Sequence, residues 1–162
     1  VVVTRKDLWN KRRLFNLKKI KTRNLKANDK HLKNKNIAIK YYKYLIPTVY
    51  KEFYGILGLF RYLNAMIIGL FRPIYRQVTR SDMRVVAHKS SALAAQNFML
   101  SMTSNGYDTC PMEGFDSLRV KKALSLPRSS EINMIISCGI RDEKGIYGDQ
   151  IRVPFEEIYF KK

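Results

Sequence analysis

The run of residues 132–138, late in the chain, constrains the fold more than any other feature. It is apolar and β-rich, and it ends at Gly139, which is typical of a strand buried in the middle of a sheet. The β-branched residues 1–4 predict a second strand. This second strand begins so abruptly that we expect it to belong to a larger sheet with further parts upstream.

Helical patterns occupy the first half of the chain. Residues 5–43 are rich in Lys and Asn with irregular apolar positions, which predicts one or two short amphipathic helices and a mobile loop around residues 28–36. Asn36 is predicted to cap a following helix, which Pro47 would kink or divide. Residues 53–71 are apolar around more than one helical face, so we expect them to need a partner surface.

A long helix is predicted over residues 85–102, with Gly106 as its left-handed stop. Residues 107–116 are interpreted as a tight connection. Asp116 is then expected to cap a short helix over residues 117–124, because its carboxylate can accept from the free amides of the first turn. The apolar stripe of the long helix is expected to consist of Leu93, Ala94, Phe98 and Met99.

The net charge of +18 is distributed unevenly. Residues 1–44 carry fifteen Lys and Arg against two acidic residues, residues 45–90 carry seven against two, and residues 91–162 carry nine against nine. A protein that wraps nucleic acid with its whole surface would be basic throughout. We therefore interpret the basic segment as a solvated surface, and nucleic acid is not the expected partner.

Compartment and metal binding can also be addressed from the sequence. The longest uncharged stretches in the middle of the chain are shorter than the ~20 apolar residues that span a bilayer, and no secretory signal is visible, so a cytoplasmic protein is expected. Cys110 and Cys138 are expected to be buried thiols in a reducing compartment. His31 and His88 have no second ligand at a suitable spacing, so no metal site is predicted. The tail over residues 151–162 is expected to be extended.

Four ordered motifs resemble the C-terminal half of FMN-dependent nitroreductases. They read A-A-Q-N-F-M-L, N-G-Y-D-T-C-P-M-E-G-F-D, I-N-M-I-I-S-C-G and I-R-V-P-F-E-E-I, and together they cover about residues 81–162. The resemblance implies an α+β fold with a mixed sheet flanked by helices. It also implies one partial domain over residues 1–162, with a basic, variable helical insertion at residues 5–80 and a flavin-binding half at residues 81–162.

The same resemblance implies a flavin site. In that family the backbone amides near Glu113 and Gly114 donate to flavin N5, and Arg152 matches a late basic residue that contacts the FMN phosphate. Gln150 stands where some members carry a second basic residue. The cofactor-binding residues implied in this way are Pro111, Met112, Glu113, Gly114, Gln150 and Arg152.

The implied activity is hydride transfer from NAD(P)H through FMN to nitroaromatic, quinone or similar acceptors, with no side chain acting as nucleophile. The family forms homodimers, and its Arg-rich phosphate-binding segment and first helices are expected upstream of Val1. One alternative stays open at this stage. The fold could be a non-catalytic scaffold that carries a basic module for nucleic acid or for an anionic surface, with binding that weakens as salt increases.

Overall fold

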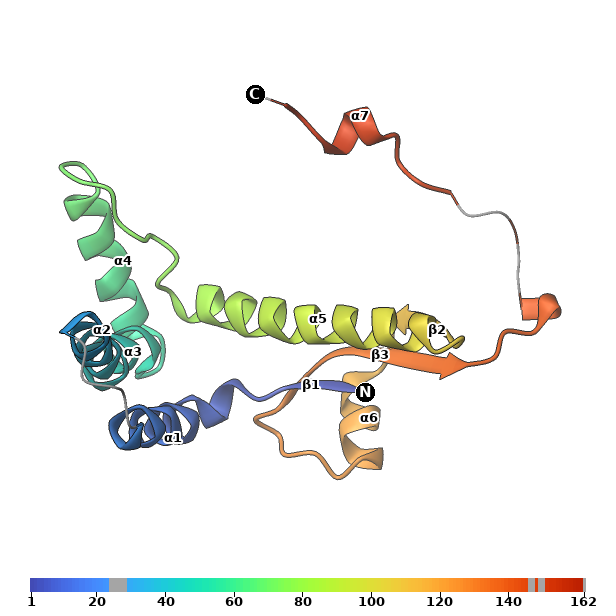
Figure 1. Cartoon of the computed structure of the whole chain (residues 1–162), viewed down its shortest axis with the longest axis horizontal. Helices are drawn as coiled ribbons and strands as arrows, with labels where there is room; N and C mark the ends of the chain where they lie inside the picture. The colour runs from blue at the N-terminus through green and yellow to red at the C-terminus, as the bar shows by residue number, and fades with distance from the viewer. Residues whose placement is uncertain (24–28, 146–147, 149–150, 162) are drawn as a thin grey trace.

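A three-stranded antiparallel sheet forms the centre of the computed structural model, which describes residues 1–23, 29–145, 148 and 151–161. Strand β3 (Glu131–Gly139) lies between β1 (Val2–Thr4) and β2 (Asp108–Met112) (Figure 1). The register pairs Val2 with Met134 on one side of β3 and Met112 with Ile135 on the other. Both predicted strands are therefore confirmed, as is the central position of β3.

Strand β2 was not predicted, since its residues were interpreted as part of a tight connection. Pro111 lacks a backbone N–H, which argues against a strand that is paired on both sides. Proline is tolerated in an edge strand, because one side of such a strand makes no ladder hydrogen bonds. Among the described strands β2 is an edge strand that pairs only with β3. This edge position explains how a strand forms over a sequence that contains proline.

The long helix α5 (Arg80–Ser104) runs alongside the sheet and packs against all three strands (Figure 1). Thr79 and Asp82 form a capping box at its start, with Thr79 Oγ1 accepting from the Asp82 amide at 3.2 Å and Asp82 Oδ2 accepting from the Thr79 amide at 3.0 Å. Beyond its end, Gly106 has φ of 80°, so the predicted left-handed stop is confirmed.

The predicted apolar stripe of α5 is wrong at three of its four positions, since only Met99 is half-buried. Leu93 and Phe98 are 69% and 42% exposed, whereas Ala95 is only 1% exposed. Small side chains allow the helix to approach the strands closely, so the buried face does not carry the largest apolar residues. At every fourth position this buried or half-buried face carries Met83, Ala87, Ser91, Ala95 and Met99.

The helices of the basic segment pack against one another near the start of α5 (Figure 1). They are η1 (Lys6–Leu8), α1 (Trp9–Thr22), α2 (Asp29–Lys40), the π-helical turn η2 (Tyr41–Leu45) and α3 (Ile46–Tyr50). The loop predicted around residues 28–36 is wrong for residues 29–36, which are helical and contain Lys and Leu, residues of good helix propensity. Asn28 lies outside the described residues.

The cap predicted at Asn36 is also wrong, because Asn36 lies inside α2. The effect predicted for Pro47 is confirmed, since the α-helical pattern is interrupted by η2 immediately before α3, where Pro47 occupies the first turn. A proline in a helix removes one backbone hydrogen bond, and its ring displaces the carbonyl of the preceding turn. The wider π-helical turn η2 accommodates this displacement.

Helix α4 (Ile56–Ile68) has apolar residues on more than one exposed face, as expected. Its anchor is Arg61, whose guanidinium forms an ion pair with Glu52 and donates to the carbonyls of Lys51 at 2.8 Å and Val78 at 3.0 Å. Within the described residues, no helix is long and apolar enough to cross a membrane. The large exposed side chains of α4 are Ile56, Leu59, Phe60, Tyr62, Leu63, Met66 and Ile67.

The two cysteines are exposed, so the expectation of buried thiols is wrong. The reason lies in the sheet, because β3 becomes exposed from Ser137 onward and Cys138 belongs to this exposed end. Cys110 sits opposite Ser137 in the same ladder.

The tail is extended over residues 151–154 but then forms one helical turn, α7 (Phe155–Ile158). The rings of Phe155 and Tyr159 stack on each other at this turn.

Candidate functional site

The segment between β2 and α6 (Ser117–Ala123) is the candidate cofactor-binding turn. Pro111 and Met112 end the strand, and Glu113 and Gly114 follow it without regular structure. The position of the turn is fixed at both ends. The pairing of Met112 with Ile135 holds one end to β3, and the start of α6 holds the other.

Asp116 secures the helical end of this turn. Its Oδ1 accepts from the amides of Leu118 at 3.0 Å and Arg119 at 3.1 Å, which confirms the predicted cap. The amide of Phe115 donates to the Glu113 carbonyl at 3.2 Å. These bonds give the turn a defined shape without using the amides of Glu113 and Gly114.

Those two amides have no acceptor among the residues that the structure describes. All four residues of the turn are exposed, and a Cβ added at Gly114 would meet no atom within 4 Å. A flat ligand could therefore approach the backbone closely and accept a hydrogen bond from it. The turn fits the flavin ring that the sequence resemblance implies.

The other two implied residues are not brought to this turn by any described contact. Arg152 lies in the exposed tail before α7, and its hydrogen bond is to the neighbouring carbonyl of Ile151 at 3.5 Å. Gln150 lies outside the described residues. The structure thus brings together Pro111, Met112, Glu113 and Gly114, and the roles of Gln150 and Arg152 stay predictions.

Glu131, at the start of β3, is the centre of an ionic cluster that the sequence did not indicate. Its carboxylate lies 2.7 Å from Nζ of Lys6 and 2.9 Å from Nε2 of His88, and it also contacts Nε of Arg84. Burial alone would raise the pKa of this carboxyl, but hydrogen bonds from Lys6, His88 and Arg84 outweigh burial and lower the pKa to about 2. The cluster joins η1, β3 and α5.

Asn133 fixes the orientation of the His88 ring. Its Nδ2 lies 3.1 Å from Nδ1 of His88 and 3.2 Å from the His88 carbonyl. With the amide donating to Nδ1, the ring proton sits on Nε2 and points to Glu131. Arg84 and His88 are four residues apart on one helix face, which the sequence could have shown, but Glu131 is too distant in sequence for any pattern to connect it.

Comparisons with known proteins agree with the fold. The model of the nitroreductase family matches residues 10–140. MhqN of Bacillus subtilis (strain 168), provisionally named an NAD(P)H nitroreductase, is 43% identical over 53 residues, which are 33% of this chain and 26% of MhqN.

Two solved structures are similar in fold. The structure of YdfN from Bacillus subtilis superposes with a TM-score of 0.61 at 19% identity, covering 99% of this chain and 61% of YdfN. A protein of Exiguobacterium sibiricum 255-15, solved in complex with FMN, superposes with a TM-score of 0.50 at 16% identity, covering 97% of this chain and 57% of that protein. The chain therefore spans about three fifths of the length of these structures.

Proposed function

Because the chain belongs to the nitroreductase family, we propose that it is an FMN-dependent oxidoreductase that transfers hydride from NAD(P)H to nitroaromatic, quinone or similar acceptors. One observation carries the assignment of the flavin site, namely an exposed turn in which the amides of Glu113 and Gly114 have no acceptor within the described part of the chain. The FMN found with the Exiguobacterium protein supports the choice of cofactor.

The turn binds and orients the ring of the cofactor in this proposal. The amides of Glu113 and Gly114 donate to N5, and the absence of a side chain at Gly114 leaves room for the ring. Pro111 restricts the backbone at the end of β2, so the donors are held at a fixed angle to the sheet. When bound, FMN supplies the hydride chemistry, and the protein supplies position and hydrogen bonding.

We assign to Arg152 the role of binding the phosphate of the cofactor. Its guanidinium is permanently charged, planar and exposed, which suits two parallel hydrogen bonds to phosphate oxygens. Gln150 would add a neutral contact where a second cation is found in some relatives. Residues 81–162 would thus provide the flavin contacts, while residues 5–80 form a variable insertion.

A second copy of the chain is the proposed partner of α4. Apolar side chains such as Phe60 and Ile67 are 60% and 59% exposed on this helix. Large exposed apolar surfaces are typical of protein interfaces. A homodimer that covers α4 would remove this surface from water, and sedimentation analysis of the purified protein measures whether it forms.

The visible absorption spectrum tests the cofactor assignment. The purified protein should be yellow, or it should take up added FMN with quenching of the flavin fluorescence. The loaded protein should then oxidise NADH or NADPH when a nitroaromatic compound or a quinone is present. A colourless preparation that takes up no added FMN would contradict the proposal.

A further inference from the structure

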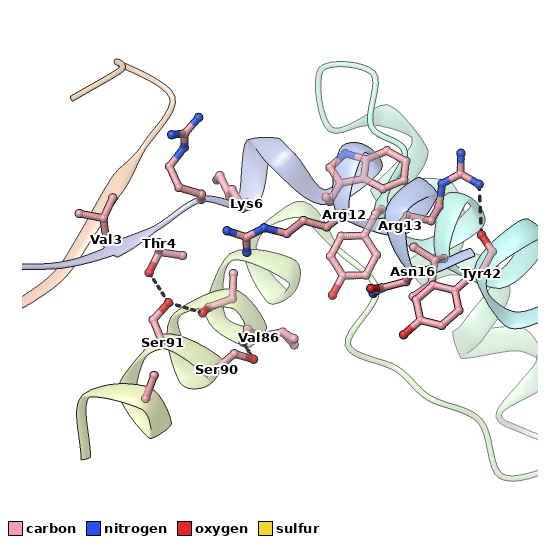
Figure 2. Close-up of a pocket in the computed structure, with 16 residues that line it drawn as sticks. Val3, Thr4, Lys6, Arg12, Arg13, Asn16, Tyr42, Val86, Ser90 and Ser91 are labelled. Carbon is pink, nitrogen blue, oxygen red and sulfur yellow. Dashed lines mark hydrogen bonds between the residues drawn. The ribbon is translucent and has the colours of Figure 1, made fainter. Parts of the chain in front are cut away.

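A cavity of about 400 Å³ lies between β1, α1 and α5, and its lining includes no residue of the turn at residues 111–114 (Figure 2). Its lining contains four cationic side chains and no carboxylate. A cavity with this lining favours an anionic occupant. The four cations are Arg5, Lys6, Arg12 and Arg13.

Three of these cations are already engaged. Arg5 pairs with Asp7 at 2.8 Å, and Lys6 pairs with Glu131 at 2.7 Å. Arg13 donates to the carbonyl of Tyr42 at 3.1 Å, and Figure 2 shows its guanidinium directed toward that carbonyl. None of the three is therefore fully available to a ligand.

Arg12 is different. It makes no hydrogen bond or ion pair with the residues that the structure describes, and Figure 2 shows its side chain extending from α1 across the cavity toward Ser90 and Ser91 on α5. A guanidinium presents several N–H donors in one plane, which match the oxygens of a phosphate or carboxylate. Arg12 is thus the group that an anion would meet.

The remaining walls combine aromatic and apolar side chains with a few neutral polar ones. Trp9 and Tyr50 stack with their ring centroids 5.9 Å apart and their planes 27° apart, and both rings line the cavity. The hydroxyls of Ser90 and Ser91 donate to carbonyls of their own helix, at 3.1 Å in each case, and Ser91 also accepts from the Thr4 hydroxyl at 2.8 Å, so neither serine offers a free donor. The walls therefore suit a flat ring, and Arg12 suits its charge.

We propose that this cavity binds a small aromatic anion, a flat ring that carries a phosphate or carboxylate group, with Arg12 on the anionic group and Trp9 beside the ring. This site is separate from the proposed flavin turn and does not depend on flavin binding.

The chain contains a single tryptophan, Trp9, so its fluorescence reports on this cavity alone. Phenyl phosphate and benzoate are the probes, with phenol and inorganic phosphate as matched fragments. At least one of the two aromatic anions should produce a saturable change, with an affinity about tenfold higher than either fragment. The tighter of the two identifies the preferred anionic group. Equal affinity for phenol would overturn the role of the charge, and equal affinity for inorganic phosphate would overturn the role of the ring.

Arg12→Gln tests the residue assignment, with Lys11→Gln as the control that removes the same charge from the same helix outside the cavity. Arg12→Gln should weaken binding about tenfold or more, whereas Lys11→Gln should change it less than about twofold. Equal effects of both variants would overturn the proposal, because binding would then follow net charge.

Flavin uptake separates this site from the proposed flavin turn. It should be the same in Arg12→Gln as in the unaltered protein, and a joint loss of flavin and phenyl phosphate binding would overturn the separation of the two sites. Circular dichroism confirms that both variants are folded, and titration calorimetry repeats each affinity without an optical signal.

Discussion

The carboxylate of Glu131 lies 2.9 Å from Nε2 of His88, and the same oxygen also contacts Arg84. Lys6 occupies the other oxygen at 2.7 Å. One acidic residue on the central strand therefore links the short helix η1 and the long helix α5 to the sheet. In a chain with so large an excess of cations, the position of this one acid matters more for the fold than the total charge does.

Acid should destabilise the protein through this cluster. The pKa of Glu131 falls from 4.5 to about 2 in the folded state, so the carboxylate stabilises the fold fully above pH 4.5 and progressively less as the pH falls toward 2. Asp7, held by hydrogen bonds from Arg5 and Ser129, has its pKa lowered from 3.8 to about 2 and contributes in the same window. Urea unfolding at a series of pH values measures this loss.

Glu131→Gln isolates the contribution of the cluster. We expect a loss of about 1–3 kcal/mol at neutral pH and a shallower dependence on pH below 4.5, because one carboxylate no longer titrates. Glu156→Gln, in the exposed helix α7, is the control and should follow the unaltered protein. An unchanged acid slope in Glu131→Gln would contradict the assignment.

Arg61→Met should reduce the free energy of unfolding by about 2–4 kcal/mol, because it leaves the Glu52 carboxylate and several carbonyls without their donor. Arg61→Lys keeps the charge but not the planar fork, so it should recover only part of the loss. Chemical denaturation of the three proteins gives the comparison, and full recovery with lysine would show that charge alone is needed.

Gly106→Ala should cost about 1 kcal/mol, because its φ of 80° is unfavourable for alanine. A Cβ there would meet nothing within 4 Å, so the cost comes from the backbone and not from a clash. Gly139→Ala also places its Cβ in open space, but without a left-handed φ, and serves as the matched control. Thermal unfolding should separate the two variants by several degrees.

Gly114→Ala should leave stability nearly unchanged, because nothing lies within 4 Å of the added Cβ. Under the proposed function it should nevertheless weaken FMN binding about tenfold, because the methyl group would stand between the backbone and the ring. Glu113→Gln should bind FMN normally, since only the backbone at this position is used. Fluorescence titration with FMN measures both affinities, and weaker binding by Glu113→Gln alone would point to the side chain instead.

Arg152→Gln should weaken FMN binding about tenfold through loss of the charged contact to phosphate. Lys161→Gln removes the same charge from the same exposed tail and should have little effect. Riboflavin, which lacks the phosphate, should not distinguish Arg152→Gln from the unaltered protein. If it did, Arg152 would have to act on another part of the cofactor.

The parts of the fold that have local sequence signals could be predicted. A β-branched run locates β3, and a carboxylate before a helix locates the cap at Asp116, because the residues that cause these features are close in sequence. The candidate turn at residues 111–114 also stood out, through its Pro and Gly and the motifs around it. Its unpartnered amides could not be predicted, because they depend on the hydrogen bonds that the surrounding chain makes.

Features that depend on distant residues were missed or wrong. The edge position of β2 follows from pairing with β3, and the choice of Ala95 rather than Leu93 for the buried face of α5 follows from the closeness of the sheet. The cavity around Arg12 requires three separate segments to meet. In each case the controlling contact joins segments that are far apart in the sequence, where periodicity and composition carry no information.

The pairing of Val3 with Ile132 also has a kinetic consequence. The helices can form early from local contacts, but among the described strands β1 pairs only with β3, and closing so long a loop costs considerable chain entropy. Docking of β1 should therefore be a late step in folding. During synthesis on the ribosome, the pairing of β1 with β3 must therefore wait until residues 131–139 have been made.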